Sequence, residues 1–398
     1  MKWRPVIKLA IAFTNFGPYH VARLRALGTR LVAGGDRLIA HEMASRERKY
    51  PWGVERGDEP FEWITLAPDR VIEDLSASEC SSAMSRALDR DRPDAVAVTG
   101  YARPESMAAL RWAEKHRRPA ILLSESQECD SPRVWWKEAV KRLRVRRFAS
   151  ALVGGPRHRA YLAKLGMPSR RVALGYNAID HQGYARRARE LHAKGRDAVP
   201  SRNYFLSVSR FAPEKNLIRL IHAYALYRAD AEPARAWDLV LCGGGPLEAE
   251  IDALIAGLGL RDVVHRPGFL QEIALSPFYA FASGFVLPSR SEPWGLVANE
   301  AAASGLPLLI SDRCGCVETL VPEPPGETGW RFNPNDVEGM AGAMATLAGL
   351  DQDEREAIGR RTEAVASAWG ADRFAAGMIE ALAMAKTYPI RTRLEAAR

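Results

Sequence analysis

The chain has 398 residues, of which 47% are hydrophobic and 26% charged. At roughly 100–200 residues per domain, this length predicts two or three domains, and the composition excludes a wholly disordered chain and a small disulfide-stapled module. The net charge is +8, and residues 1–180 hold the excess, with 32 Lys and Arg against 21 Asp and Glu. The five cysteines are odd in number and scattered, which is typical of reduced thiols in a cytoplasmic protein.

Apolar runs typical of buried strands alternate with helix-length amphipathic stretches along the whole chain. The predicted strands are residues 6–13, 95–99, 120–123, 151–153, 204–208, 239–242, 284–287 and 308–310. This alternation predicts parallel sheets flanked by helices. The predicted fold class is therefore α/β, with two Rossmann-like domains and a cleft between them at the carboxyl ends of the strands.

The polar segment 181–202 contains few large apolar residues and is the best candidate for a domain boundary. We predict an N-terminal, acceptor-side domain over residues 1–180, a linker over 181–202 and a C-terminal, ligand-binding domain over 203–370. Residues 371–398 complete the chain. Their apolar stripe predicts a helix that packs back on the N-terminal domain.

Basic residues are densest over residues 137–147, where the sequence KEAVKRLRVRR contains six bases and one acid. One interpretation is a solvated helix face, and the other is a surface for anionic lipid or an acidic acceptor. The second interpretation makes the protein cytoplasmic and peripheral to the inner face of the membrane. No aromatic-rich basic groove or DNA-binding motif accompanies the run, so we expect no nucleic-acid partner.

The most informative segment is PSRSEPWGLVANEAAASGLP, residues 288–307. It follows a predicted strand as a loop and continues as an alanine-rich helix. The free amides and the dipole at the start of that helix, near Gly295, suit a phosphate. Glu292 and Glu300 flank this anion site. Because carboxylates repel a phosphate, they are better explained as acceptors for neutral hydroxyl groups, such as those of a sugar and a ribose.

This segment resembles family 4 of the retaining glycosyltransferases, which have the two-domain GT-B fold. Seven residues separate Glu292 from Glu300, as in that family. Further motifs extend the resemblance over most of residues 204–335: VSRFAPEKNL at 208–217, LCGGGP at 241–246, RPGF at 266–269, GCVE at 315–318 and GWRFNP at 329–334. Over residues 1–180 the resemblance is one of architecture.

The resemblance implies transfer of a sugar, with retention, from a nucleotide-diphospho-sugar to a hydroxyl of a glycan, lipid-linked or small-molecule acceptor. A UDP-sugar is favoured over a GDP-sugar. Arg210 and Lys215 would neutralise the leaving diphosphate, since both cations follow a predicted strand. Glu292 would contact the donor sugar as a catalytic residue, and Glu300 would bind the ribose. The other implied donor-binding residues are Gly17, Gly268, Phe269, Leu270, Gly295, Leu296 and Val297.

In the N-terminal domain, the first predicted strand leads into TNFGPYH at residues 14–20, where the family has a glycine-rich loop and this chain has one glycine. Many relatives also have a His after a later strand, but the corresponding LLSESQ at 122–127 has none. His20 is a candidate catalytic substitute at the start of a helix, and the alternative is a locally bonded surface His. The acceptor-side candidates are Tyr101, Glu125, Asp130 and Arg133.

Other functions fit parts of this pattern. A nicotinamide-dependent oxidoreductase also pairs Rossmann-like domains, but no G-x-G-x-x-G follows the first strand. The Gly-rich run at 243–245 is followed by Glu248 where that motif needs a third small residue. A glycosyl phosphorylase on the same fold and a catalytically inactive sugar-binding protein remain alternatives.

We expect no cofactor and no metal ion. Two Asp-x-Asp tripeptides occur, at 89–91 and 351–353, but both lie in helix-prone charged stretches. Arg210, Lys215 and the helix dipole can supply the positive charge that a metal ion would otherwise provide.

Overall fold

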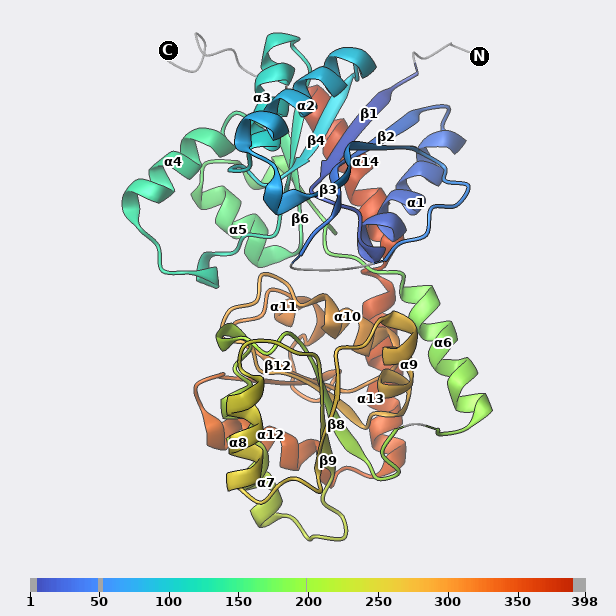
Figure 1. Ribbon diagram of the computed structural model, residues 1–398, viewed down its shortest axis with the longest axis vertical. Coiled ribbons are helices and arrows are strands. Elements are labelled where there is room, and N and C mark those ends of the chain that lie inside the picture. Colours follow the sequence, from blue (N-terminus) through green and yellow to red (C-terminus); the bar gives the residue numbers. More distant parts are fainter. Residues whose placement is uncertain (1–5, 49–52, 198, 389–398) are drawn as a thin grey trace. The chain divides into compact units, whose positions relative to one another are not determined.

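The computed structural model describes residues 6–48, 53–197 and 199–388. Over these ranges the chain divides into two compact units. The first unit comprises residues 6–128, 132–179 and 371–388, and the second comprises Cys129–Ser131 and Asp180–Gly370. Each unit contains one parallel sheet with helices packed on it (Figure 1). The predicted α/β fold class with two Rossmann-like domains is therefore confirmed.

The sheet of the first unit has seven strands in the order β3-β2-β1-β4-β5-β6-β7. These are β1 (Lys8–Phe13), β2 (Arg37–Arg46), β3 (Glu62–Val71), β4 (Ala95–Thr99), β5 (Ala120–Ser124), β6 (Ser150–Val153) and β7 (Val172–Leu174). The sequence pattern does not predict β2, β3 or β7. Buried His41 and Glu42 interrupt the apolar pattern of β2. Strand β3 lies at the sheet edge, where polar residues are exposed.

The helices of the first unit come from both ends of the chain. They are α1 (Pro18–Ala33), α2 (Ala77–Asp91), α3 (Pro104–Lys115), α4 (Trp135–Val145), α5 (Pro156–Lys164) and α14 (Ala371–Thr387), with the 3-10 turns η1 (Ile72–Asp74) and η3 (Ser169–Arg171). Helix α14 packs on α1, β6 and β7. A Cβ at Gly377 would lie 2.4 Å from the carbonyl oxygen of Leu174, so glycine lets α14 approach β7 closely. Residues 389–398 lie outside the described residues.

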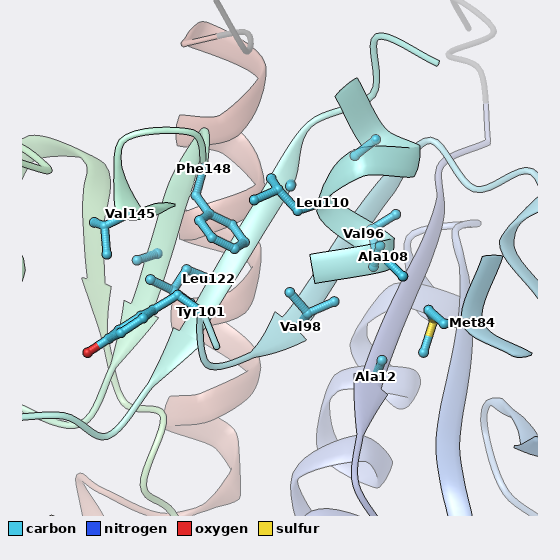
Figure 2. Packing of buried hydrophobic residues seen from close by; sticks show 14 of the residues in the cluster. Ala12, Met84, Val96, Val98, Tyr101, Ala108, Leu110, Leu122, Val145 and Phe148 are labelled. Carbon is cyan, nitrogen blue, oxygen red and sulfur yellow. The ribbon is translucent and has the colours of Figure 1, made fainter. Parts of the chain in front are cut away.

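Side chains of β1 alternate between two hydrophobic cores, one on each face of the sheet. Leu9, Ile11 and Phe13 join the core under α1 and α14, whereas Ala10 and Ala12 join the core under α2 and α3. Figure 2 shows the second of these cores, in which side chains of β4, β5 and α3 interdigitate. The central strands are apolar on both faces for this reason.

The second unit has a six-stranded sheet in the order β10-β9-β8-β11-β12-β13. Its strands are β8 (Tyr204–Val208), β9 (Asp238–Cys242), β10 (Val264–Gly268), β11 (Gly284–Leu287), β12 (Leu308–Ser311) and β13 (Gly329–Phe332). Its helices are α6 (His181–Lys194), α7 (Leu217–Asp230), α8 (Glu248–Gly257), α9 (Glu272–Phe281), α10 (Leu296–Ala303), α11 (Val317–Leu320), α12 (Val337–Gly349) and α13 (Gln352–Ser367), with the 3-10 turns η2 (Glu128–Asp130), which leads into this unit, and η4 (Pro213–Lys215).

Residues 181–202, predicted as a linker, begin with a helix of the second unit. Asp180 caps α6 by accepting a hydrogen bond from the Gly183 amide at 3.0 Å. Tyr184 and Ala188 are buried, and the helix packs on α9 and α10. The stripe that α6 buries consists mostly of small residues. A count of large apolar residues therefore underestimates its packing.

Replacing Phe148 by Ala will lower the free energy of unfolding of the first unit by about 3–5 kcal/mol, because the ring is fully buried among the core residues of Figure 2. Leu143→Ala is the matched control, since the Leu143 side chain is exposed, and its cost will stay within about 0.5 kcal/mol. Urea unfolding followed by circular dichroism measures both. Equal losses in the two variants would contradict this packing.

Candidate functional site

The strand order reverses once in each sheet, between β1 and β4 in the first unit and between β8 and β11 in the second. At such a switch point the loops after two neighbouring strands diverge, and open α/β sheets bind ligands there. In the second unit, the loop after β8 contains Arg210 and Lys215, and the loop after β11 contains Glu292 and Gly295. The second unit therefore brings these four predicted residues to one place.

Asn216 fixes the end of the loop that carries Lys215. Its backbone has a φ of 62°, in the left-handed region, and its side chain is buried. The side-chain amide donates to the carbonyl oxygens of Pro288 at 3.0 Å and Pro334 at 2.7 Å. Asn216 thus ties the ends of β11 and β13 to the start of α7.

The glycine-rich run at 243–245 serves backbone packing. A Cβ at Gly243 would lie 1.8 Å from the Ser209 carbonyl oxygen, and one at Gly245 would lie 2.8 Å from that of Phe211. The Gly243 amide also donates to the Gly268 carbonyl at 2.8 Å. The loops after β8, β9 and β10 therefore pack backbone to backbone. This close packing accounts for the glycines at 243 and 245, and no dinucleotide-binding motif is needed to explain them.

The segment Cys314–Cys316 holds the loop before α10 through backbone hydrogen bonds. The Gly315 amide donates to the Glu292 carbonyl at 3.0 Å, and the Cys316 amide donates to the Trp294 carbonyl at 3.1 Å. Gly295 has a φ of 102°, and a Cβ there would lie 2.7 Å from the Leu287 side chain. This glycine lets the loop turn sharply into α10.

The amides of Leu296 and Val297 open the first turn of α10, and the Ala298 amide is the first to close onto Gly295, at 2.9 Å. Orphan amides and the helix dipole favour an anion at such a start. The fold therefore forms the helix terminus that the sequence predicts. Its predicted use as a phosphate site remains a prediction.

The charged residues of the site are paired with one another. The Lys215 ammonium contacts the Glu292 carboxylate, and both side chains are largely buried. The Ser289 hydroxyl also donates to Glu292, at 3.3 Å. The Arg210 guanidinium pairs with Glu214 at 2.7 Å. A ligand phosphate would compete with two carboxylates for these two cations.

Glu300 is 2% exposed, and Tyr279 of α9 donates its hydroxyl to Oε2 at 2.7 Å. Tyr279 could not be predicted from the sequence, because nothing in the pattern of α9 marks a partner for a residue 21 positions away. Gly268 has a φ of 83° with open space beside it, and Phe269 is 54% exposed. Both predicted residues lie at the end of β10.

In the first unit, the loop after β1 leads into α1, and His20 lies in the first turn of that helix. Its Nδ1 accepts the Gly17 amide at 3.1 Å, and its ring lies 4.6 Å from that of Phe13, centre to centre. Burial, followed by the charge of Arg23, lowers the pKa of His20 to about 3. The imidazole is therefore neutral near pH 7, with its proton on Nε2. It can donate a hydrogen bond to a ligand but cannot supply positive charge.

A buried carboxylate holds this loop from below. Glu42 of β2 is 5% exposed and accepts three hydrogen bonds, from the Phe16 amide at 2.9 Å, the Trp63 indole at 2.8 Å and the Thr65 hydroxyl at 2.6 Å. These hydrogen bonds fix the backbone of the loop at Phe16 to the neighbouring strand β3. Glu42 could not be predicted from the sequence, because it lies in a strand that the sequence pattern does not indicate.

Further polar groups gather near Glu125 in the first unit. The Asn177 side chain donates to Glu125 at 2.9 Å. Arg23 is 1% exposed, donates its Nε to the Ala178 carbonyl at 2.9 Å and lies over the Tyr176 ring. Within the described residues, Arg23 Nη2 and Asn177 Oδ1 are buried without a hydrogen-bond partner.

The other acceptor-side candidates have different environments. Tyr101 is buried in the hydrophobic core and reaches the Ser126 hydroxyl at 3.4 Å. Arg133 donates to the Glu128 carbonyl at 2.7 Å and lies over the Tyr161 ring. These contacts give Arg133 a role in holding its own loop. Asp130 groups with the second unit, where its carbonyl accepts the Ser291 hydroxyl at 2.8 Å.

The described residues contain no group of three or more His, Cys, Asp or Glu side chains arranged to hold a metal ion. The tripeptide 89–91 ends α2, where Asp91 pairs with His41, and Asp351 caps α13. None of the helices over the described ranges is both long and apolar enough to cross a bilayer.

Comparison with known proteins finds a family match within the second unit. Residues 189–365 match the family glycosyl transferases group 1. The resemblance to glycosyltransferases that the motifs predict is thereby confirmed. The match covers nearly all of the second unit and includes the loops after β8 and β11.

Curated relatives align over a similar region. The sulfoquinovosyl transferase SQD2 of Arabidopsis thaliana is 32% identical over 44% of this chain and 32% of its own length. The alpha-D-kanosaminyltransferase of Streptomyces kanamyceticus is 32% identical over 53% of each chain. The aligned part thus spans about a third to a half of these relatives.

Solved structures match over nearly the whole chain. Sucrose-phosphate synthase from Thermosynechococcus elongatus has a TM-score of 0.68 at 20% identity, covering 98% of this chain and 100% of that one. The HepE protein of Anabaena, solved with UDP, has a TM-score of 0.69 at 17% identity, covering 95% and 100%. At these identities the match shows the fold, which is GT-B.

The lowered pKa of His20 predicts a dependence of stability on pH. In the unfolded chain His20 binds a proton below about pH 6.5, whereas in the folded chain it stays neutral down to about pH 3. Lowering the pH through this range therefore favours the unfolded state. His20→Gln will therefore lose less stability than the wild type between pH 7.5 and pH 4.5. Urea unfolding at both values measures this. His222→Gln, at an exposed His, is the control, and equal slopes in wild type and His20→Gln would refute the burial effect.

Proposed function

We propose that the protein is a retaining glycosyltransferase of family 4, which moves a sugar from a nucleotide-diphospho-sugar to a hydroxyl acceptor. The observation that carries this proposal is the meeting of Arg210, Lys215 and the start of α10 where β8 and β11 diverge. Two fixed cations and a helix N-terminus suit a diphosphate. The family match over residues 189–365 supports the same assignment.

In this proposal the diphosphate of the donor replaces carboxylates as the partner of the two cations. Lys215 now contacts Glu292, and Arg210 pairs with Glu214. When Lys215 turns to the diphosphate, Glu292 is freed to accept a hydroxyl of the donor sugar. Negative charge grows on the diphosphate as it leaves, and preorganised cations stabilise that charge most in the transition state.

We propose that the acceptor attacks from the face that the diphosphate leaves, which retains the anomeric configuration, and that a phosphate oxygen takes the acceptor proton. The engagement of both candidate carboxylates supports this route over a covalent intermediate. Glu300 is buried against Tyr279, and Glu292 is held by Lys215 and Ser289. Arg210, Lys215 and the α10 dipole would supply the positive charge, with no metal ion or cofactor.

We assign the acceptor hydroxyl to the first unit, where Glu125 accepts a hydrogen bond from the Asn177 side chain at 2.9 Å. His20 would contribute a neutral donor at Nε2. The acceptor would be a glycan, a lipid-linked sugar or a small molecule. The five cysteines are odd in number and scattered along the chain, which supports a cytoplasmic enzyme.

We propose a UDP-sugar as donor, by analogy with the UDP in the HepE structure. A mycobacterial relative, 30% identical over 44% of this chain, is named as GDP-mannose-dependent and represents the competing donor class. Calorimetric titration of the protein with UDP and with GDP separates these donors. Tighter binding of GDP would replace the UDP assignment and leave the transferase assignment intact.

Lys215→Ala and Arg210→Ala will each reduce the transfer rate by about two to three orders of magnitude, as the loss of one preorganised donor does elsewhere. Arg235→Ala, at an exposed cation of the same unit, is the control and will retain full activity. A coupled assay of nucleoside diphosphate release, run over a panel of nucleotide-sugars, measures the rate. Near-normal rates in both site variants would refute the diphosphate assignment.

Glu300→Gln and Glu292→Gln will have different effects, because the two carboxylates address different parts of the donor. Glu300→Gln will weaken binding of bare UDP, whereas Glu292→Gln will depress transfer more than it weakens UDP binding. Calorimetry with UDP, together with the transfer assay, separates the two effects. The roles would be wrong if both variants lost binding and transfer in equal proportion.

A further inference from the structure

Helix α4 presents its large apolar side chains to solvent. Only Val145 of its eleven residues is buried, whereas Trp135 is 82% exposed, Leu143 68%, Trp136 52% and Val140 40%. Eleven large hydrophobic residues are exposed over the described ranges, and four of them lie on this helix. The helix lies at the outer side of the first unit, beyond α5 (Figure 1). Clustered exposure of this kind marks an interaction surface.

The usual polarity of a surface helix is inverted in α4. At about 100° per residue, its exposed apolar residues fall on one arc about 140° wide. The opposite side carries Val145 together with Glu138 and Lys141. Lys141 donates to the Tyr161 hydroxyl at 3.1 Å, and that hydroxyl donates to Glu138 at 2.8 Å. Polar bonds therefore hold the helix on the protein, and its apolar arc faces outward.

Basic residues flank this apolar arc on both sides. Arg142 and Arg146 lie along one border, and Lys137 and Arg144 lie along the other, by the same helical geometry. Arg142 and Arg144 donate to the backbone carbonyls of Lys164 and Tyr101, at 3.1 and 3.3 Å, and these neutral partners leave their charge in place.

The other two bases of the run are engaged within the protein. Arg147 pairs with Glu114 at 2.6 Å, and Lys141 pairs with Glu138 at 2.7 Å. Glu138 is also the one acid of the helix, and it faces Tyr161. The outward face thus combines an apolar centre with positive borders and carries no acid.

We propose that α4 docks the first unit on an anionic lipid surface, with Trp135, Trp136 and Leu143 in the boundary between headgroups and acyl chains. Tryptophan suits that boundary because it is amphipathic, and the flanking cations would meet anionic headgroups. Charge complementarity favours a lipid surface, since positive borders on both sides of an apolar strip match a continuous negative plane. The proposal goes beyond sugar transfer and holds whichever donor and acceptor the protein uses.

Sedimentation with vesicles tests this proposal on the full chain. Wild-type protein will bind vesicles of equal parts phosphatidylglycerol and phosphatidylcholine at ~0.01 M ionic strength, and will bind weakly at ~0.5 M or to pure phosphatidylcholine. Combined Arg142→Gln, Arg144→Gln and Arg146→Gln will weaken binding about 100-fold at low salt. The matched control changes Arg86, Arg111 and Lys115, three exposed bases of α2 and α3, to Gln and keeps wild-type binding.

A second variant tests the apolar arc without changing charge. Trp135→Ser with Trp136→Ser will weaken vesicle binding about tenfold and reduce the quenching of tryptophan fluorescence by brominated lipid chains. Urea unfolding checks that each variant is folded. Equal binding losses in the α4 and control charge variants would reduce the effect to net charge and overturn the proposal. Wild-type binding by the Trp variant, or a lipid-free dimer that this variant abolishes, would also overturn it.

Discussion

The ion pair between Lys215 and Glu292 joins the two loops on which the site of the second unit is built. These loops follow β8 and β11, which diverge at the switch point of the sheet. Both side chains are largely buried, so removing one partner would leave a poorly solvated charge behind. In the proposed function, an incoming diphosphate would exchange one anionic partner of Lys215 for another.

Hydrogen bonds near this ion pair restrain the backbone of both loops. Asn216 ties the Lys215 loop to the ends of β11 and β13, and the amides of Gly315 and Cys316 brace the loop that carries Glu292. In the first unit, different groups hold the loop after β1. There the buried carboxylate of Glu42 holds the loop, and a neutral His20 stands at its end. One switch point is strongly charged, and the other offers hydrogen bonds.

Local patterns account for what the sequence predicts correctly. Strand β1 and helix α10 are encoded in contiguous residues, as an apolar run and as an alanine-rich stretch after a glycine, and both form as predicted. Glu292 and Lys215 can be named in advance because each lies in a motif. Their contact across 77 positions becomes visible only in the fold.

Long-range partners account for what the sequence misses. Tyr279 and Glu42 act on residues of other elements, so no local pattern marks them. Helix α6 buries mostly small residues, so its sequence does not show the large apolar stripe that would predict a packed helix. In α4 the sequence contains an amphipathic stripe but does not reveal which side faces the protein. A polar triad with Tyr161 decides that question.

The place of α14 in the first unit sets the order in which the chain can complete its cores. Phe374 and Met378 are fully buried beside strands formed by residues that leave the ribosome some two hundred positions earlier. Until α14 is synthesised, the face of the first sheet under α1 lacks part of its cover. The second unit is contiguous apart from Cys129–Ser131, and its core needs no such late segment. The unit that begins the chain is therefore the last to finish folding during synthesis, with apolar surface that stays open to solvent or to a chaperone while the ribosome makes the other.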